Sequence, residues 1–174
     1  QIAVEFNLIL ISRNGIKVNE SFTEDSLKDG AGNLILQVGD EVKLKVKNTG
    51  TKPCYYTLID IQPNNITNVL LPKASDSPAD YFLSSGASMI VPTAFRLNEP
   101  LGQELFKLIA TKNPINLRPL DQRRGIDDHK EKDPFEILIN QTYNHDESLS
   151  TRGISSNVPA GQVNIYSLPF IIKK

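Results

Sequence analysis

The strict alternation of residues 42–47 is the feature that most constrains the fold of this chain. The run VKLKVK places three apolar side chains on one face of an extended strand and three lysines on the other. It follows Val38-Gly39-Asp40 and ends at Asn48, and both flanks are rich in turn-forming residues. The pattern predicts an antiparallel strand with one buried and one exposed face.

The next segment, residues 54–61 (CYYTLIDI), is almost continuously apolar and rich in β-branched and aromatic residues. This composition is typical of a strand buried on both faces, and we expect it to pair with 42–47. Pro169 in the last predicted strand belongs at an edge or a bulge, because proline cannot donate to a ladder. The further strands are predicted at 4–11, 34–37, 68–71, 89–91, 94–97, 104–111 and 162–172. Short strands separated by turns predict an all-β fold, an antiparallel β-sandwich of Ig-like or jelly-roll-like type.

Residues 114–157 interrupt the strand pattern with a polar, charged composition. Asp133 as N-cap and Pro134 at the first helical position predict one short helix over 134–142, with Phe135, Leu138 and Ile139 as its apolar stripe. The sequence thus predicts a single β-sandwich domain over 1–174 with a helix-containing insert at 114–157. Loops of this kind, held by a rigid scaffold, are where binding usually resides.

Charge and hydropathy argue against two classes of partner. Lys plus Arg number 19 and Asp plus Glu number 20, so a net charge of −1 gives no field that would attract nucleic acid. No run reaches the roughly 18 to 20 apolar residues of a transmembrane helix. Because the sequence opens on Gln1 instead of Met, we expect it to be a segment of a longer chain.

The single cysteine and the two histidines are the first candidate site residues. Cys54 is the single thiol, and its place at the head of an apolar strand predicts a buried small hydrophobe. His129 and His145 lie among carboxylates in the segment 127–147, but their spacing matches no metal signature. We interpret them as solvated loop residues.

Pairs of carboxylates and clusters of Lys and Arg are the remaining candidate site residues. Asp76 with Asp80, or Glu99 with Glu104, could pair for acid and base chemistry, although spacing alone cannot place two carboxyls across a cleft. The lysines of 42–47 are typical of a solvated strand face that resists edge pairing. The last cluster, offset by neighbouring acids, contains Arg118, Arg123, Arg124, Lys130 and Lys132. We assign no catalytic residue, no metal ligand and no cofactor.

The order of four motifs adds a family resemblance. Val38-Gly39-Asp40, the segment 68–72 (NVLLP), the segment 100–104 (PLGQE) and the strand 106–111 (FKLIAT) together resemble a bacterial domain-of-unknown-function family. Its members often lie C-terminal to caspase-like peptidases, and sometimes to kinases or repeat modules. The resemblance covers 34–117, implies no catalytic residue, and favours the bacterial cytoplasm over the cell envelope.

These observations predict a non-enzymatic accessory or recognition domain, appended to a signalling or protease-type enzyme and binding a protein partner or ligand through loops. The alternative is a metal- or carbohydrate-binding domain that uses the acidic, histidine-containing segment 127–147. A third hypothesis is an oligomerising module that offers an exposed strand edge.

Overall fold

A computed structural model describes residues 1–19, 22–124 and 162–174. The described residues form strands connected by loops and by three single-turn 3-10 helices. The strands are β1 (Val4–Arg13), β2 (Ile16–Lys17), β3 (Ile35–Gln37), β4 (Glu41–Asn48), β5 (Cys54–Ile61), β6 (Thr67–Leu71), β7 (Phe82–Leu83), β8 (Ser88–Ile90), β9 (Phe95–Arg96), β10 (Gly102–Thr111) and β11 (Val163–Lys173). The 3-10 helices are η1 (Glu24–Leu27), η2 (Pro78–Asp80) and η3 (Arg118–Leu120).

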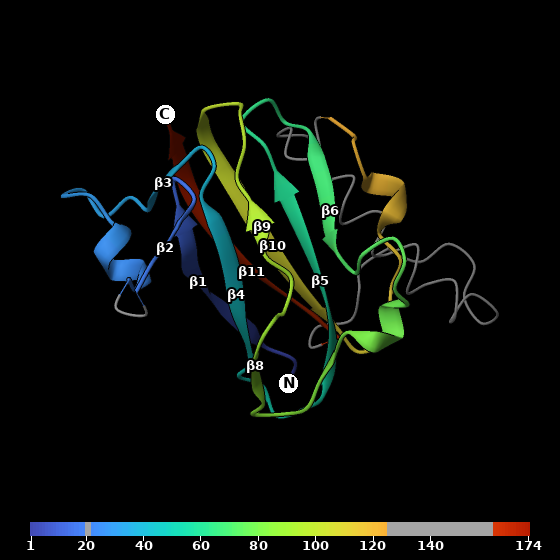
Figure 1. Ribbon diagram of the computed structural model, residues 1–174. Coiled ribbons are helices and arrows are strands. Elements are labelled where there is room, and N and C mark those ends of the chain that lie inside the picture. Colours follow the sequence, from blue (N-terminus) through green and yellow to red (C-terminus); the bar gives the residue numbers. More distant parts are fainter. Residues whose placement is uncertain (20–21, 125–161) are drawn as a thin grey trace, which may run out of the picture.

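Two sheets pack face to face, which confirms the all-β sandwich (Figure 1). The smaller sheet has the order β2-β1-β4-β8, and β9 also pairs with β4. The larger sheet has the order β3-β11-β10-β5-β6, and β7 also pairs with β5. Among the strands of the described residues, every pairing is antiparallel except that of β3 with β11. The described residues contain no helix with the length and apolar character of a membrane crossing.

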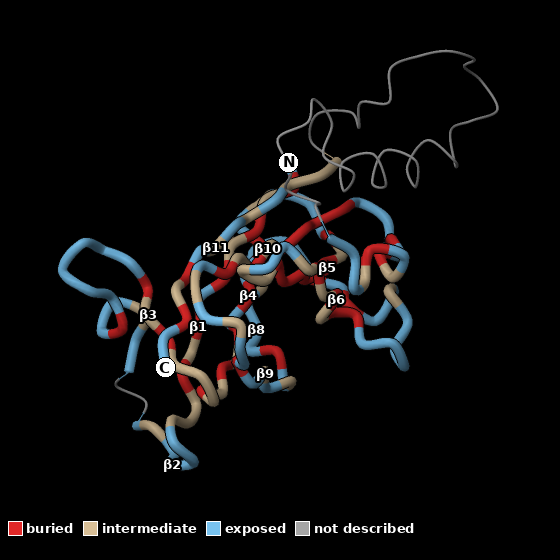
Figure 2. The backbone as a smooth tube through the Cα atoms, turned by 90° about the horizontal axis from the view of Figure 1, so that it is seen from above, coloured by how far each residue is buried: buried red, intermediate tan, exposed pale blue. Residues whose placement is uncertain are grey.

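The main core lies between the sheets and follows the alternation of the strands. The even-numbered residues of β1 and β4 face inward, and Phe6, Leu8 and Leu44 are at most 1% exposed. On the facing sheet, Leu58 and Phe106 are equally buried. Burial is concentrated along the strands, while the connecting loops are largely exposed (Figure 2).

A second apolar cluster covers the outer face of the larger sheet. Ile59 of β5 and Ile109 of β10 point away from the main core and pack with Ile115, Leu117 and Leu120. The polar composition of residues 114–157 did not predict that its first part would be buried structure. Beyond it, residues 122–124 run along β6 through backbone hydrogen bonds to Thr67 and a bridge between Ile66 and Arg124. The helix predicted over 134–142 lies outside the described residues.

The prediction that residues 42–47 pair with 54–61 is wrong, because β4 and β5 belong to different sheets. β4 pairs with β1, β8 and β9, whereas β5 lies between β10 and β6. The chain crosses between the sheets at buried Asn48, whose amide donates to the carbonyls of Lys52 (2.8 Å) and Leu83 (3.1 Å). A Cβ at Gly50 would lie 2.2 Å from the Gln1 carbonyl oxygen, so this crossing requires glycine.

The other strand predictions are confirmed within a few residues at each end, although β2 and β7 were not predicted. Pro169 lies in β11 opposite Leu105 without disturbing the register with β10. The amide of Ile171 donates to Leu34 on the β3 side, so the nitrogen of Pro169, two residues earlier, faces the same side. β3 covers only residues 171–173 of that edge. Pro169 therefore occupies an edge position, as its missing N–H requires.

Candidate functional site

The outer face of the smaller sheet carries the most apolar cavity among those described. On this face, Ile9 of β1 lies opposite Lys43 of β4 in the ladder. Lys45, the next outward residue of β4, lies opposite Ile90 of β8. The segment that begins at Phe22 lies over one side of this face, leaving a groove of about 650 Å³. We call this cavity the sheet groove; its apolar lining includes Ile9, Ile11, Phe22 and Ile90.

Polar contacts hold the wall of the sheet groove in place. Asn7 donates from Nδ2 to Glu24 Oε2 at 3.0 Å, which ties η1 to β1. Asp25 accepts from Lys28 at 3.2 Å in an exposed ion pair. The apolar side chains, by contrast, stay open to solvent, since Ile90 is 53% exposed and Phe22 is 41% exposed. Clustered apolar exposure of this kind often marks a binding surface.

The predicted lysine face is confirmed as the outer face of β4. Lys43 lines the sheet groove, and Lys45 and Lys47 extend the basic row along the strand. Glu5 on β1 lies opposite Lys47 in the ladder and shortens this basic row at one end. The sheet groove therefore has a basic border on its β4 side and an acidic wall on its η1 side.

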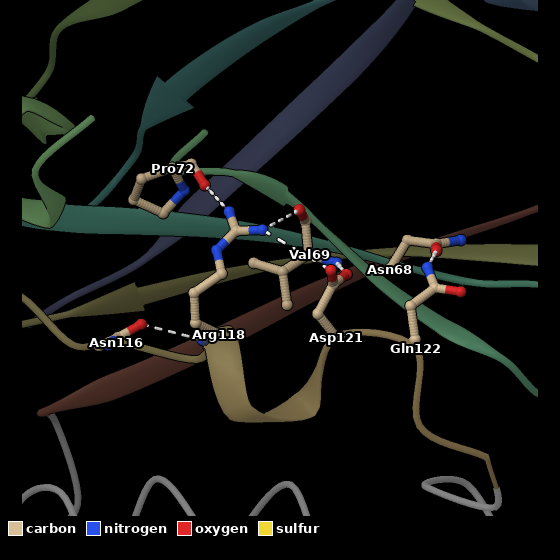
Figure 3. A network of polar contacts seen from close by, with 7 residues as sticks. All are labelled: Asn68, Val69, Pro72, Asn116, Arg118, Asp121 and Gln122. Atoms are coloured by element: carbon tan, nitrogen blue, oxygen red, sulfur yellow. Dashed lines mark hydrogen bonds and ion pairs between the residues drawn. The ribbon is translucent and has the colours of Figure 1, made fainter. Parts of the chain in front are cut away.

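Arg118 binds backbone carbonyls in the cover of the larger sheet (Figure 3). Its guanidinium donates to the carbonyl of Val69 (3.3 Å) and to that of Pro72, and it lies 3.9 Å from Asp121. Asp121 in turn accepts from the amide of Val69 at 2.8 Å. These contacts anchor η3 to β6, so Arg118 is a structural residue of this cover.

Cys54 is buried, as predicted from its place at the head of an apolar strand. Burial raises the pKa of its thiol to about 11, so the thiolate that a nucleophile requires is scarce at neutral pH. His129 and His145 lie outside the described residues. Within the described ranges no group of three or more His, Cys, Asp or Glu side chains could hold a metal ion.

Neither carboxylate pair considered from the sequence forms an acid–base pair. Asp80 closes a capping box with Ser77 at η2, and Asp76 accepts from the Tyr81 hydroxyl at 2.6 Å. Glu99 is exposed. Glu104 instead meets Asp60, a residue that none of the considered pairs included.

Asp60 and Glu104 form a buried carboxyl pair between β5 and β10, with 6% and 5% exposure. They share the inward parity of Leu58 and Phe106, so both point between the sheets. Asn68 Nδ2 donates to Asp60 Oδ2 at 3.3 Å. The other oxygen, Asp60 Oδ1, is buried and accepts no hydrogen bond from an N–H group of the described residues. A protonated Glu104 can donate to that oxygen.

The charge state of the pair follows from its burial. Desolvation, followed by the hydrogen bond and the charge of Asp60, raises the pKa of Glu104 to about 10. Burial also raises the pKa of Asp60, against the opposing effect of its hydrogen bonds to Glu104 and Asn68. The pair therefore shares one proton at neutral pH. Asp60 interrupts the apolar run of β5 at an inward position, which is the sequence signal that could have identified it.

Comparison with known proteins gives one family match. Residues 35–114 match the family model described as Domain of unknown function (DUF4384). The match runs from β3 through β10 and agrees with the resemblance seen in the sequence. No curated protein matches the chain.

Proposed function

We propose that this chain is a non-catalytic recognition domain that binds an extended segment of a protein partner in the sheet groove. The observation that carries the proposal is that one outer face of the sandwich is covered by apolar side chains and the other is not. Ile115, Leu117 and Leu120 cover the larger sheet, whereas no described segment covers Ile9 and Ile90 on the smaller one. An uncovered apolar face supported by a rigid sheet is well suited to binding.

The chemistry of the groove suggests the partner's character. Its apolar floor would take two or three aliphatic or aromatic side chains of an extended peptide, which point alternately toward and away from the sheet. Lys43 and Lys45 lie along one border, so an acidic residue on that side of the peptide would be favoured. The expected partner segment is therefore apolar with acidic residues on one flank.

The architecture of the longer protein belongs to the same proposal. The family resemblance supports a bacterial domain appended to a peptidase or another signalling enzyme, in which recognition by this domain brings substrates or partners to the attached enzyme. The isolated domain should then show no peptidase, esterase or glycosidase turnover. Turnover that a single substitution in this chain abolishes would contradict the non-catalytic assignment.

A peptide library displayed on phage and selected on the isolated domain tests the binding proposal. Selected peptides should share apolar positions flanked by Asp or Glu. Their affinity should fall by about tenfold on Ile90→Asp, which places a carboxylate in the groove, and by less on Lys43→Gln. Ile16→Asp is the matched control, because Ile16 is 71% exposed and does not line the groove. Equal binding to all variants would place recognition elsewhere.

A further inference from the structure

A second cavity lies at the end of the larger sheet where β5 begins and β10 ends. Tyr55 begins the outward row of β5, and its ladder partners are Phe82 of β7 on one side and Thr111 of β10 on the other. Lys52 precedes β5 and Lys112 follows β10, so both lysines lie at this end of the strands. Together they line a cavity of about 690 Å³, which we call the basic pocket.

The wall of the basic pocket is an exposed aromatic pair. The rings of Tyr55 and Phe82 lie 5.3 Å apart at 61°, an edge-to-face arrangement. Phe82 nevertheless remains 46% exposed and faces the cavity. Phe22 and Phe82 are the phenylalanines with the largest described exposure, and each lines a cavity. A ring left open in this way offers a face on which a flat ligand can stack.

The charges of the basic pocket have one sign. Lys52 and Lys112 are exposed, and no described acid lines the cavity with them. No ion pair joins either ammonium group to a carboxylate of the described residues. Two ammonium groups beside one cavity favour the binding of an anion. The whole chain has a net charge of −1, so its overall charge does not attract anions, and the attraction is local to this cavity.

We propose that the basic pocket binds a small aromatic anion, a planar ring that carries a phosphate or carboxylate group. The ring would stack on Phe82 and Tyr55, and the anionic group would accept hydrogen bonds from Lys52 and Lys112. This site is separate from the sheet groove in both location and charge. The inference does not depend on the proposed partner binding.

Titration of the whole chain with phenyl phosphate, followed by amide NMR shifts, tests this assignment. Saturable shifts should be confined to the amides of Tyr55, Phe82 and Lys112 and their neighbours. Lys112→Gln and Lys52→Gln should each weaken binding by about fivefold, and Phe82→Leu should weaken it by a similar factor. Lys17→Gln is the control, because Lys17 is also exposed but lies in β2 of the other sheet and lines neither cavity.

Two further probes identify which part of the ligand is recognised. Benzoate that binds as tightly as phenyl phosphate would indicate a carboxylate ligand, and weaker benzoate binding would indicate a phosphate; either result supports the site. Phenol that binds as tightly as both would overturn it, because the lysines would then contribute nothing. Absence of saturable binding below about 10 mM, or equal weakening by Lys17→Gln, would also overturn it.

Discussion

Replacing Glu104 by Gln should remove most of the pH dependence that the buried carboxyl pair gives to folding. Glutamine has the shape of the protonated acid, and its Nε2 can donate to the Asp60 carboxylate in place of the acid O–H. The substitution therefore keeps the hydrogen bond and removes the ionisation. The substitution leaves the hydrogen bond that Asn68 donates to Asp60 unchanged.

The direction of the pKa shift of Glu104 determines whether the free energy of unfolding rises or falls with pH. The pKa of Glu104 rises from 4.5 in the unfolded chain to about 10 in the folded protein, so the folded state holds an extra proton between these values. This contribution to stability is complete below the unfolded pKa and is lost as pH rises toward the folded pKa. The free energy of unfolding falls in that window by up to about 1.4 kcal/mol per pH unit. Between about pH 5 and about pH 8 the wild type should therefore lose about 2 to 4 kcal/mol relative to Glu104→Gln.

Urea denaturation of both proteins at a series of pH values measures this difference. The two free energies should be similar near about pH 5 and diverge as pH rises, with the variant more stable. Glu99→Gln is the matched control, because Glu99 is exposed and should leave the curve unchanged. If the wild type and Glu104→Gln give parallel curves, the pair does not share a proton and the reasoning is refuted.

Three further substitutions or reagents test the rest of the fold. Leu120→Ala should cost about 2 to 4 kcal/mol in urea denaturation, because Leu120 is 4% exposed in the cover of the larger sheet; no loss would mean that the cover is dispensable. Arg13→Gln should cost about 3 kcal/mol by the same assay, since it removes the ion pair (2.8 Å) of fully buried Asp40; a cost below about 0.5 kcal/mol would mean that the pair is solvated. Cys54 should resist a thiol reagent such as dithionitrobenzoate in native buffer and react in urea, and rapid native labelling would contradict its burial.

The sequence by itself determined the strands and which of their faces are buried. Alternation with a period of two is a local property, so residues 42–47 predicted the inward and outward faces of β4 without knowledge of its neighbours. The apolar run of 54–61 likewise predicted a strand buried on both faces, and the structure places it between β10 and β6. The missing N–H of Pro169 is a property of the residue itself, so the sequence predicted an edge or a bulge there, and the structure shows the edge.

Only the tertiary structure decided which strands and side chains meet. Pairing depends on contacts between distant segments, so proximity in sequence suggested that 42–47 and 54–61 form a hairpin, whereas the buried amide of Asn48 directs the chain into the other sheet. Asp60 and Glu104 come together because β5 and β10 are ladder neighbours, a relation that no spacing along the chain contains. The sheet groove and the basic pocket arise in the same way, since pairing between strands of one sheet brings the segments that line each cavity together.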